Sequence, residues 1–255
     1  MELRHELRLA LELADLADAT ALPLFRDRAL RVDTKPDATP VTEADRRAER
    51  AIRDRLAAVR PGHGVVGEEY GATGETGTRW IIDPIDGTMN FVRGIPVWGS
   101  LIALEIDGRV DVGVVSAPAI GHRWWAARGL GAFRNGEPIE VSGVGDLGDA
   151  QISYNSYATA EEFGIGPQMA DLERRAWRTR GYGDFWSFML VAEGAADIAV
   201  EPVAALWDLA PLLVIVEEAG GRFTDLTGAA TPSGGNAVAT NGLLHDETLA
   251  LLRRG

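Results

Sequence analysis

The sequence contains no cysteine, which excludes disulfide bonds, metal sites built on thiolates and cysteine nucleophiles. It also lacks any apolar stretch close to the ~20 residues that a membrane-spanning helix requires. Residues 1–13 mix charged residues with leucine, so they lack the apolar segment of a signal peptide. From these absences we expect a cytoplasmic protein with no membrane partner.

Histidine and positive charge are scarce as well. The four histidines show none of the spacings with carboxylates that are typical of zinc sites. With 25 Lys and Arg against 38 Asp and Glu, the net charge is −13, which argues against nucleic acid as a partner. The same charge would repel a phosphorylated substrate unless a divalent cation offsets it locally.

The pattern along the 255 residues is that of a globular protein with mixed helices and strands. A helix rich in leucine and alanine is expected over residues 2 to about 25, and an amphipathic helix over 42–60. Strands are expected near residues 65–66, 79–82, 97–106, 110–116 and 123–127, and after the glycine-rich stretch 141–150 helices and strands alternate. This pattern predicts an α/β (α+β) layered sandwich, with an N-terminal subdomain over 1–148 and a C-terminal subdomain over 149–255.

The most informative segment is Trp80-Ile81-Ile82-Asp83-Pro84-Ile85-Asp86-Gly87-Thr88. Its apolar start predicts a buried strand, which Pro84 would end. Asp83 and Asp86 can then converge on one cation, together with the Ile85 carbonyl. Gly87 lets the backbone approach a ligand, and the amides after it can bind an anion. Hard oxygen ligands beside an anion site favour Mg²⁺ that bridges to a phosphate.

Three other acids have simpler explanations when each is considered alone. Glu68 follows a short expected strand and could be an exposed loop residue. Asp45 and Asp208 each fall near the start of an expected helix, where a carboxylate caps the helix. Thr42 is the expected N-cap in front of Asp45.

The order of these segments, however, resembles that of the inositol monophosphatase superfamily, which consists of Mg²⁺-dependent phosphatases. The resemblance covers nearly the whole chain and rests on Lys35, Asp45, Gly67-Glu68-Glu69, Asp83 to Thr88, Trp207-Asp208 and Ala219-Gly220-Gly221. It implies an αβαβα layered sandwich and a homodimer. It also implies a small phosphorylated metabolite as substrate and two or three Mg²⁺ ions in each site.

The resemblance further implies a role for each site residue. The implied metal ligands are Glu68, Asp83, the Ile85 carbonyl, Asp86 and Asp208. Gly87 and Thr88 would offer backbone amides to the phosphate, and Glu69 would orient the site. Asp45 and Thr88 would hold and deprotonate the attacking water, and together with Glu68 they form the implied catalytic set.

Two further acids, Asp184 and Glu201, bear on the identity of the substrate. Inositol phosphatases have a small residue in the place of Asp184, and the resemblance puts Glu201 at the alcohol part of the substrate. Two extra acids would suit a cationic alcohol such as histidinol. Residues 181–202 also resemble bacterial histidinol-phosphate phosphatases of this superfamily. We therefore expect hydrolysis of L-histidinol phosphate, a reaction of histidine biosynthesis.

Several alternatives stay open at this point. Asp184 could instead be the N-cap of a helix expected over 185–193. The substrate could be inositol 1-phosphate, with fructose 1,6-bisphosphate as a second substrate. A nucleotide 3′-phosphate is a further alternative, although the sequence shows no clear adenosine-binding pattern. An inactive metal-binding protein is the alternative of a different class, and the complete ligand set argues against it.

Overall fold

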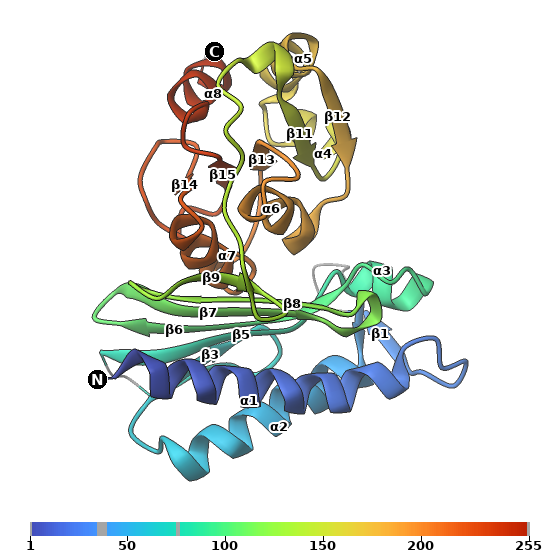
Figure 1. Cartoon of the computed structure of the whole chain (residues 1–255). Coiled ribbons are helices and arrows are strands. Elements are labelled where there is room, and N and C mark those ends of the chain that lie inside the picture. Colours follow the sequence, from blue (N-terminus) through green and yellow to red (C-terminus); the bar gives the residue numbers. More distant parts are fainter. Residues whose placement is uncertain (1, 35–39, 75–76, 254–255) are drawn as a thin grey trace.

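The computed structural model describes residues 2–34, 40–74 and 77–253, and these form alternating layers of helices and sheets (Figure 1). The helices are α1 (Leu3–Ala21), α2 (Glu43–Val59), α3 (Thr88–Arg93), α4 (Tyr157–Glu162), α5 (Gly166–Arg175), α6 (Asp184–Ala192), α7 (Leu206–Glu218) and α8 (His245–Leu252). Short 3-10 helices span Leu22–Leu24, Pro118–Ile120 and Leu147–Asp149. No helix in these ranges is long and apolar enough to cross a membrane.

The first sheet has eight strands among the described residues, in the order β10-β9-β8-β7-β6-β5-β3-β4. They are β3 (Gly64–Gly67), β4 (Gly71–Thr73), β5 (Thr78–Asp86), β6 (Gly99–Ile106), β7 (Arg109–Ala117), β8 (His122–Ala127), β9 (Gly131–Arg134) and β10 (Glu137–Pro138). Within the described strands of this sheet, only β3 and β5 pair in parallel, with Gly67 opposite Ile82. Because their carboxyl ends lie side by side, this pairing brings Glu68 next to Asp83.

The second sheet has five strands in the described part of the chain, in the order β12-β11-β13-β15-β14. They are β11 (Gln151–Tyr154), β12 (Arg178–Gly181), β13 (Ile198–Glu201), β14 (Arg222–Thr224) and β15 (Ala237–Thr240). In a separate two-stranded sheet, β1 (Val32–Thr34) pairs antiparallel with β2 (Pro40–Thr42). Lys35, which the resemblance included, lies outside the described residues.

The alternation of side chains along the strands explains how the layers stack. In β5, Trp80 and Ile82 pack against α1 and α2, whereas Ile81 packs on the opposite face toward α7. In β13, Ala199 faces α6 and α7, and its neighbours Ile198 and Val200 face the outer helices. Both faces of each sheet are therefore covered, which requires the continuous apolar runs seen in the sequence.

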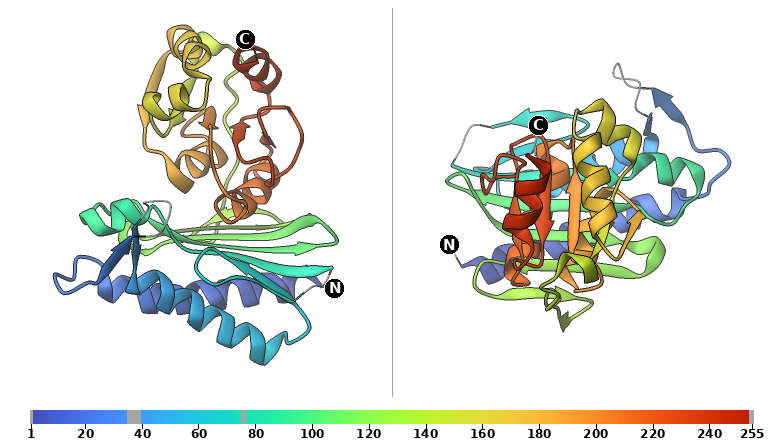
Figure 2. Two further views of the ribbon diagram at one scale, coloured as in Figure 1. Left: turned by 180° about the vertical axis from the view of Figure 1, so that it is seen from behind. Right: turned by 90° about the horizontal axis from the view of Figure 1, so that it is seen from above.

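The result is an αβαβα arrangement (Figures 1 and 2). Helices α1 and α2 form one outer layer, α6 and α7 lie between the two sheets, and α4, α5 and α8 cover the outer face of the second sheet. This is the layered α/β sandwich that the sequence predicts. The subdomain boundary at residue 148 stays a prediction, because α6 and α7 share one core with both sheets.

Several local expectations were wrong. β5 does not stop before Pro84 but continues to Asp86. The pairing of β5 with β6 shifts register between Asp83 and Asp86, so the strand can continue although Pro84 has no amide hydrogen to donate to the sheet. Helix α3 was not expected from the sequence. Its N-cap is Gly87, which has a positive φ of 78°. The sequence over residues 160–177 predicts mostly one helix, but the structure has α4 and α5 there, separated by a turn at Gly164, which has a φ of 79°.

Candidate active site

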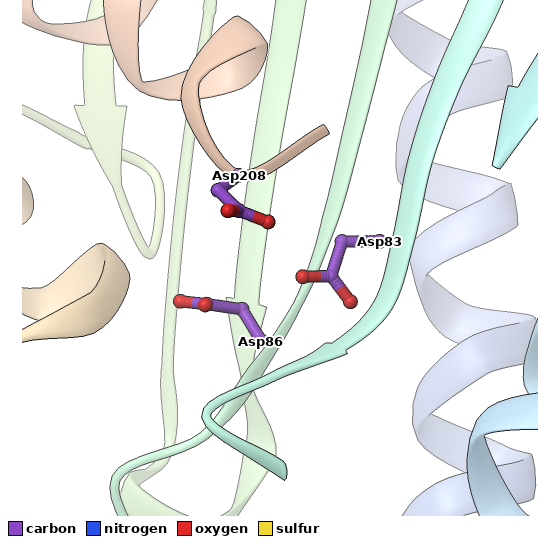
Figure 3. Close-up of side chains that lie close together, drawn as sticks. All are labelled: Asp83, Asp86 and Asp208. Atoms are coloured by element: carbon purple, nitrogen blue, oxygen red, sulfur yellow. The ribbon is translucent and has the colours of Figure 1, made fainter. Parts of the chain in front are cut away.

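Three carboxylates from two separate elements meet at the end of β5. Oxygens of Asp83, Asp86 and Asp208 lie within 4.8 Å of one another, and their side chains converge on one space (Figure 3). Asp83 and Asp86 belong to the end of β5, and Asp208 lies in the first turn of α7. This donor set fits a divalent cation that prefers oxygen ligands.

Backbone hydrogen bonds fix the orientation of each of these carboxylates. The Ile85 amide donates to Asp83 Oδ1 at 2.9 Å, within the part of β5 where the register shifts. The Phe185 amide donates to Asp86 Oδ2 at 2.7 Å, and the Ala205 amide donates to Asp208 Oδ2 at 2.7 Å. Asp208 therefore does help to cap α7, as expected when it is considered alone. The same side chain also reaches the cluster.

A hollow of ≈430 Å³ opens beside the cluster. It is lined by most of the residues that the sequence singles out, namely Glu68, Asp83, Ile85, Asp86, Gly87, Thr88, Asp184 and Asp208. An adjoining cavity of ≈70 Å³ is lined by Asp86, Asp184 and Asp208 together with Glu201. The fold thus gathers acids from distant parts of the chain around two adjoining spaces that share Asp86, Asp184 and Asp208 in their linings.

Asp45 lies behind the hollow and reaches it through Thr88. Its carboxylate is fully buried and accepts from the Thr42 amide at 2.8 Å and from Thr42 Oγ1 at 2.5 Å. Thr42 is the N-cap of α2, as expected. Thr88 Oγ1 lies 3.4 Å from Asp45 Oδ1 and 3.0 Å from the Ile85 carbonyl oxygen, so its hydroxyl connects Asp45 with the residues that line the hollow.

The carboxylates of the cluster are buried close together and repel one another when they are charged. Burial raises the pKa of Asp83 well above its usual value, and the nearby charges of Glu68, Asp86 and Asp208 raise it further. Burial and the charge of Asp184 do the same for the pKa of Asp86, and burial raises the pKa of Asp208 to about 7. A cation bound among these oxygens would offset the repulsion, so the charge of the site also fits a metal.

Asp184 is not the N-cap of the helix that follows it. Gly183 occupies that position, and Asp184 is the first residue of α6. Instead Asp184 Oδ2 accepts from Asn90 Nδ2 at 3.1 Å, and the residue adopts a positive φ of 50°. Burial raises the pKa of Asp184 to about 6. The alternative of simple helix capping is therefore wrong for this residue.

Glu201 ends β13 and points into the smaller cavity. Its Oε1 atom is buried without a hydrogen-bond partner among the described residues. Burial, followed by the charges of Asp184 and Asp208, raises its pKa to about 8. An unsatisfied buried acceptor is costly, so this atom is a strong candidate to receive a donor from a ligand.

Sequence reasoning missed Asn90, which links the loop after β5 to α6. Its Nδ2 donates to the Val97 carbonyl oxygen at 2.8 Å as well as to Asp184. The same crowding explains Gly87, where a Cβ atom would lie 3.0 Å from the Val97 oxygen and 3.4 Å from Asp184 Oδ2. No local pattern signals these contacts, because Asn90 and Asp184 are 94 positions apart.

Comparison with known proteins agrees with this geometry. The model of the inositol monophosphatase family matches residues 2–255, and the chain belongs to this family. The family consists of metal-dependent phosphatases, so the chain is a phosphoric monoester hydrolase.

Individual relatives are similar over almost their whole length. Histidinol-phosphatase from Mycobacterium tuberculosis is 55% identical, with 98% of both chains covered. Histidinol-phosphatase from Streptomyces coelicolor is 50% identical, with 98% of this chain and 97% of the relative covered. The solved structure of an inositol monophosphatase from Zymomonas mobilis has a TM-score of 0.88 and 33% identity over 99% of both chains.

Proposed function

We propose that this protein hydrolyses L-histidinol phosphate to L-histidinol and inorganic phosphate with the help of Mg²⁺. The observation that carries the proposal is the position of two additional acids, Asp184 and Glu201, directly beside the carboxylate cluster. The two histidinol-phosphatases at 55% and 50% identity support the same substrate.

For the metal we propose two or three Mg²⁺ ions held by Glu68, Asp83, the Ile85 carbonyl, Asp86 and Asp208. Bound Mg²⁺ supplies positive charge that offsets the phosphate and lowers the pKa of a water molecule. The backbone amides of Gly87 and Thr88 hold the phosphate oxygens at the edge of the hollow. The paired ends of β3 and β5 and the first turn of α7 keep these ligands in place before substrate arrives.

Asp45 and Thr88 carry the proton away from the attacking water. The Thr88 hydroxyl lies between the hollow and Asp45 Oδ1, at 3.4 Å from the carboxylate. A proton taken from water by Thr88 Oγ1 therefore passes on to Asp45 as the hydroxyl donates its own proton. Burial raises the pKa of Asp45 to about 6, which places it close to the range where a general base works best at neutral pH.

Asp184 and Glu201 select the alcohol. Both carboxyls have raised pKa values, about 6 and about 8, chiefly because burial disfavours their charged forms. An ammonium group brought into the cavity provides the missing counter-charge and donates to the unsatisfied Glu201 Oε1. A neutral polyol provides hydrogen bonds but no charge, so we expect it to bind more weakly.

The proposal also includes a homodimer in the cytoplasm. Apolar side chains on and just after α3 support a protein contact there, since Met89, Val92 and Ile95 are 64%, 38% and 45% exposed. Light scattering coupled to size-exclusion chromatography measures the mass directly, and a monomer at micromolar concentration would contradict this part of the proposal.

The function is tested by phosphate release from L-histidinol phosphate, inositol 1-phosphate and fructose 1,6-bisphosphate, each with Mg²⁺ and with EDTA. We expect activity only with Mg²⁺. We also expect a kcat/KM for histidinol phosphate roughly 100-fold above the other two, the scale of one buried charge pair. A preference for either sugar-like ester would reject the substrate but keep the metal chemistry, and equal activity in EDTA would reject the metal dependence.

A further inference from the structure

A buried carboxylate on α2, outside the residues assigned above, holds the turn that carries Glu68. Glu49 lies one helical turn after Asp45 and is 0% exposed. Its Oε2 atom accepts from the Glu69 amide at 2.7 Å, and its Oε1 atom accepts from the Tyr70 amide at 3.2 Å. Two successive amides of the turn between β3 and β4 therefore point at one side chain from another element.

Arg53 completes this arrangement. Its Nε atom donates to Glu49 Oε1 at 2.7 Å, and the Arg53 side chain is itself only 14% exposed. The guanidinium also donates to Thr73 Oγ1 at 3.1 Å and to the Gly71 carbonyl oxygen, so it holds the strand that leaves the turn. The buried charge of Glu49 is thus paired and hydrogen-bonded, as a buried carboxylate must be.

The same contact explains why glycine precedes Glu68. A Cβ atom on Gly67 would lie 2.1 Å from Glu49 Oε1 and 2.5 Å from its carboxylate carbon. Glycine is needed here for space, because the Glu49 carboxylate packs directly against the backbone at the end of β3. The Gly-Glu-Glu segment is therefore shaped by a residue 18 positions earlier in the chain.

The turn needs such support. The Glu68 amide donates to the Ile82 carbonyl oxygen at 3.2 Å, which continues the pairing of β3 with β5. The next two amides, those of Glu69 and Tyr70, donate to Glu49 instead of to the sheet. Helix α2 thus supports the site from two directions, with Asp45 behind Thr88 and Glu49 behind Glu68.

We infer that Glu49 is a positioning residue that holds the Glu68 turn beside Asp83 and so sets the affinity of the site for its divalent cation. The inference rests on the proposed metal-dependent function. Groups that orient metal ligands in this way typically change metal affinity or activity by 10–100-fold when they are removed.

The test compares Glu49→Gln with wild type and with Asp54→Asn, which removes an exposed carboxylate from the same helix. Calorimetric titration with Mn²⁺ in the absence of substrate measures metal affinity, and thermal unfolding in EDTA measures the fold. We expect the Mn²⁺ Kd of Glu49→Gln to rise by about 10–100-fold. Its activity should return toward the wild-type kcat at high Mg²⁺, and Asp54→Asn should match wild type throughout.

A second variant keeps the inference testable if Glu49→Gln does not fold. Gly67→Ala keeps Glu49 but drives its carboxylate away from the turn, so it should weaken Mn²⁺ binding in the same way. An unchanged Mn²⁺ Kd in a folded Glu49→Gln protein, or in Gly67→Ala if Glu49→Gln does not fold, would overturn the inference. Failure of the proposed function gives a different result: wild type would bind Mn²⁺ without hydrolysing histidinol phosphate, and the effect of Glu49→Gln on binding would persist.

Discussion

The Phe185 amide donates a 2.7 Å hydrogen bond to Asp86 Oδ2, although the two residues are 99 positions apart. This bond docks the start of α6 onto the carboxylate cluster. Because Asp184 directly precedes Phe185, the contact that orients a proposed metal ligand also fixes the acid proposed to select the alcohol. Metal binding and substrate selection are therefore coupled through one short stretch of backbone.

Asp86→Asn tests the cluster with little change of shape. The asparagine oxygen can still accept from the Phe185 amide, but the charge at the proposed metal site is lost. We expect turnover of every phosphate ester to fall by more than about 100-fold, since ligand charge sets both metal affinity and water activation. In EDTA at pH 8, the variant should unfold at a higher temperature than wild type, because one of several repelling carboxylates has been removed.

Asp184→Asn tests substrate selection. The residue has a φ of 50°, a conformation that asparagine tolerates and alanine does not, so the amide is the better matched replacement. We expect KM for histidinol phosphate to rise by roughly 10–100-fold, the range for loss of a buried charge partner. KM for inositol 1-phosphate should change little. If steady-state assays show that KM rises equally for both esters, Asp184 shapes the site but does not recognise the positive charge of the substrate.

Much of this site could be predicted from the sequence because its chemistry is local. Asp83, Asp86 and Gly87 lie within five residues, and an apolar run followed by proline and glycine already indicates a strand end with close backbone approach. Even there one detail was wrong, since a register shift lets β5 continue past Pro84. Local rules did not anticipate it, because the partner strand β6 decides whether the proline amide is needed.

The remaining parts depend on contacts that no local pattern encodes. Asp208 taken alone indicated only a helix cap, and the structure shows that it caps α7 and reaches the cluster as well. The roles of Asn90 and Glu49 could not be predicted from the sequence. Their hydrogen-bond partners depend on how α3 packs near α6 and how α2 packs near the end of β3. The resemblance to a family predicted which distant acids share the site. The groups that hold those acids in place were found only in the structure.

The pH dependence of stability follows from the raised pKa values. Burial raises the pKa of Asp45 and Asp184 to about 6, that of Asp208 to about 7 and that of Glu201 to about 8. In the unfolded chain these acids titrate near 4, so between pH 5.5 and 8 the folded protein binds more protons than the unfolded one. The stability of the metal-free protein should therefore fall as pH rises through this range.

Thermal unfolding in EDTA measures this effect, with roughly 2–4 °C of Tm for each 1 kcal/mol in a chain of this size. Added Mg²⁺ should raise Tm more at pH 8 than at pH 5.5, because its ligands must be deprotonated to bind. A metal-free Tm that increases from pH 5.5 to 8 would contradict the assignment of these buried acids.

Thr88→Val separates proton transfer from metal binding. Valine keeps the shape of threonine but removes the hydroxyl that joins the hollow to Asp45 Oδ1 and to the Ile85 carbonyl oxygen. Because the proposed carboxylate ligands are untouched, Mn²⁺ affinity should stay within about threefold of wild type, well below the 10–100-fold effect of removing a supporting group. kcat should fall by about 10²–10⁴-fold, the usual contribution of general base catalysis. Thr88→Ser retains the hydroxyl and should keep most of the activity. If Thr88→Val instead lowers metal affinity and leaves kcat intact at saturating Mg²⁺, the hydroxyl orients the Ile85 carbonyl, and the water must lose its proton by another route.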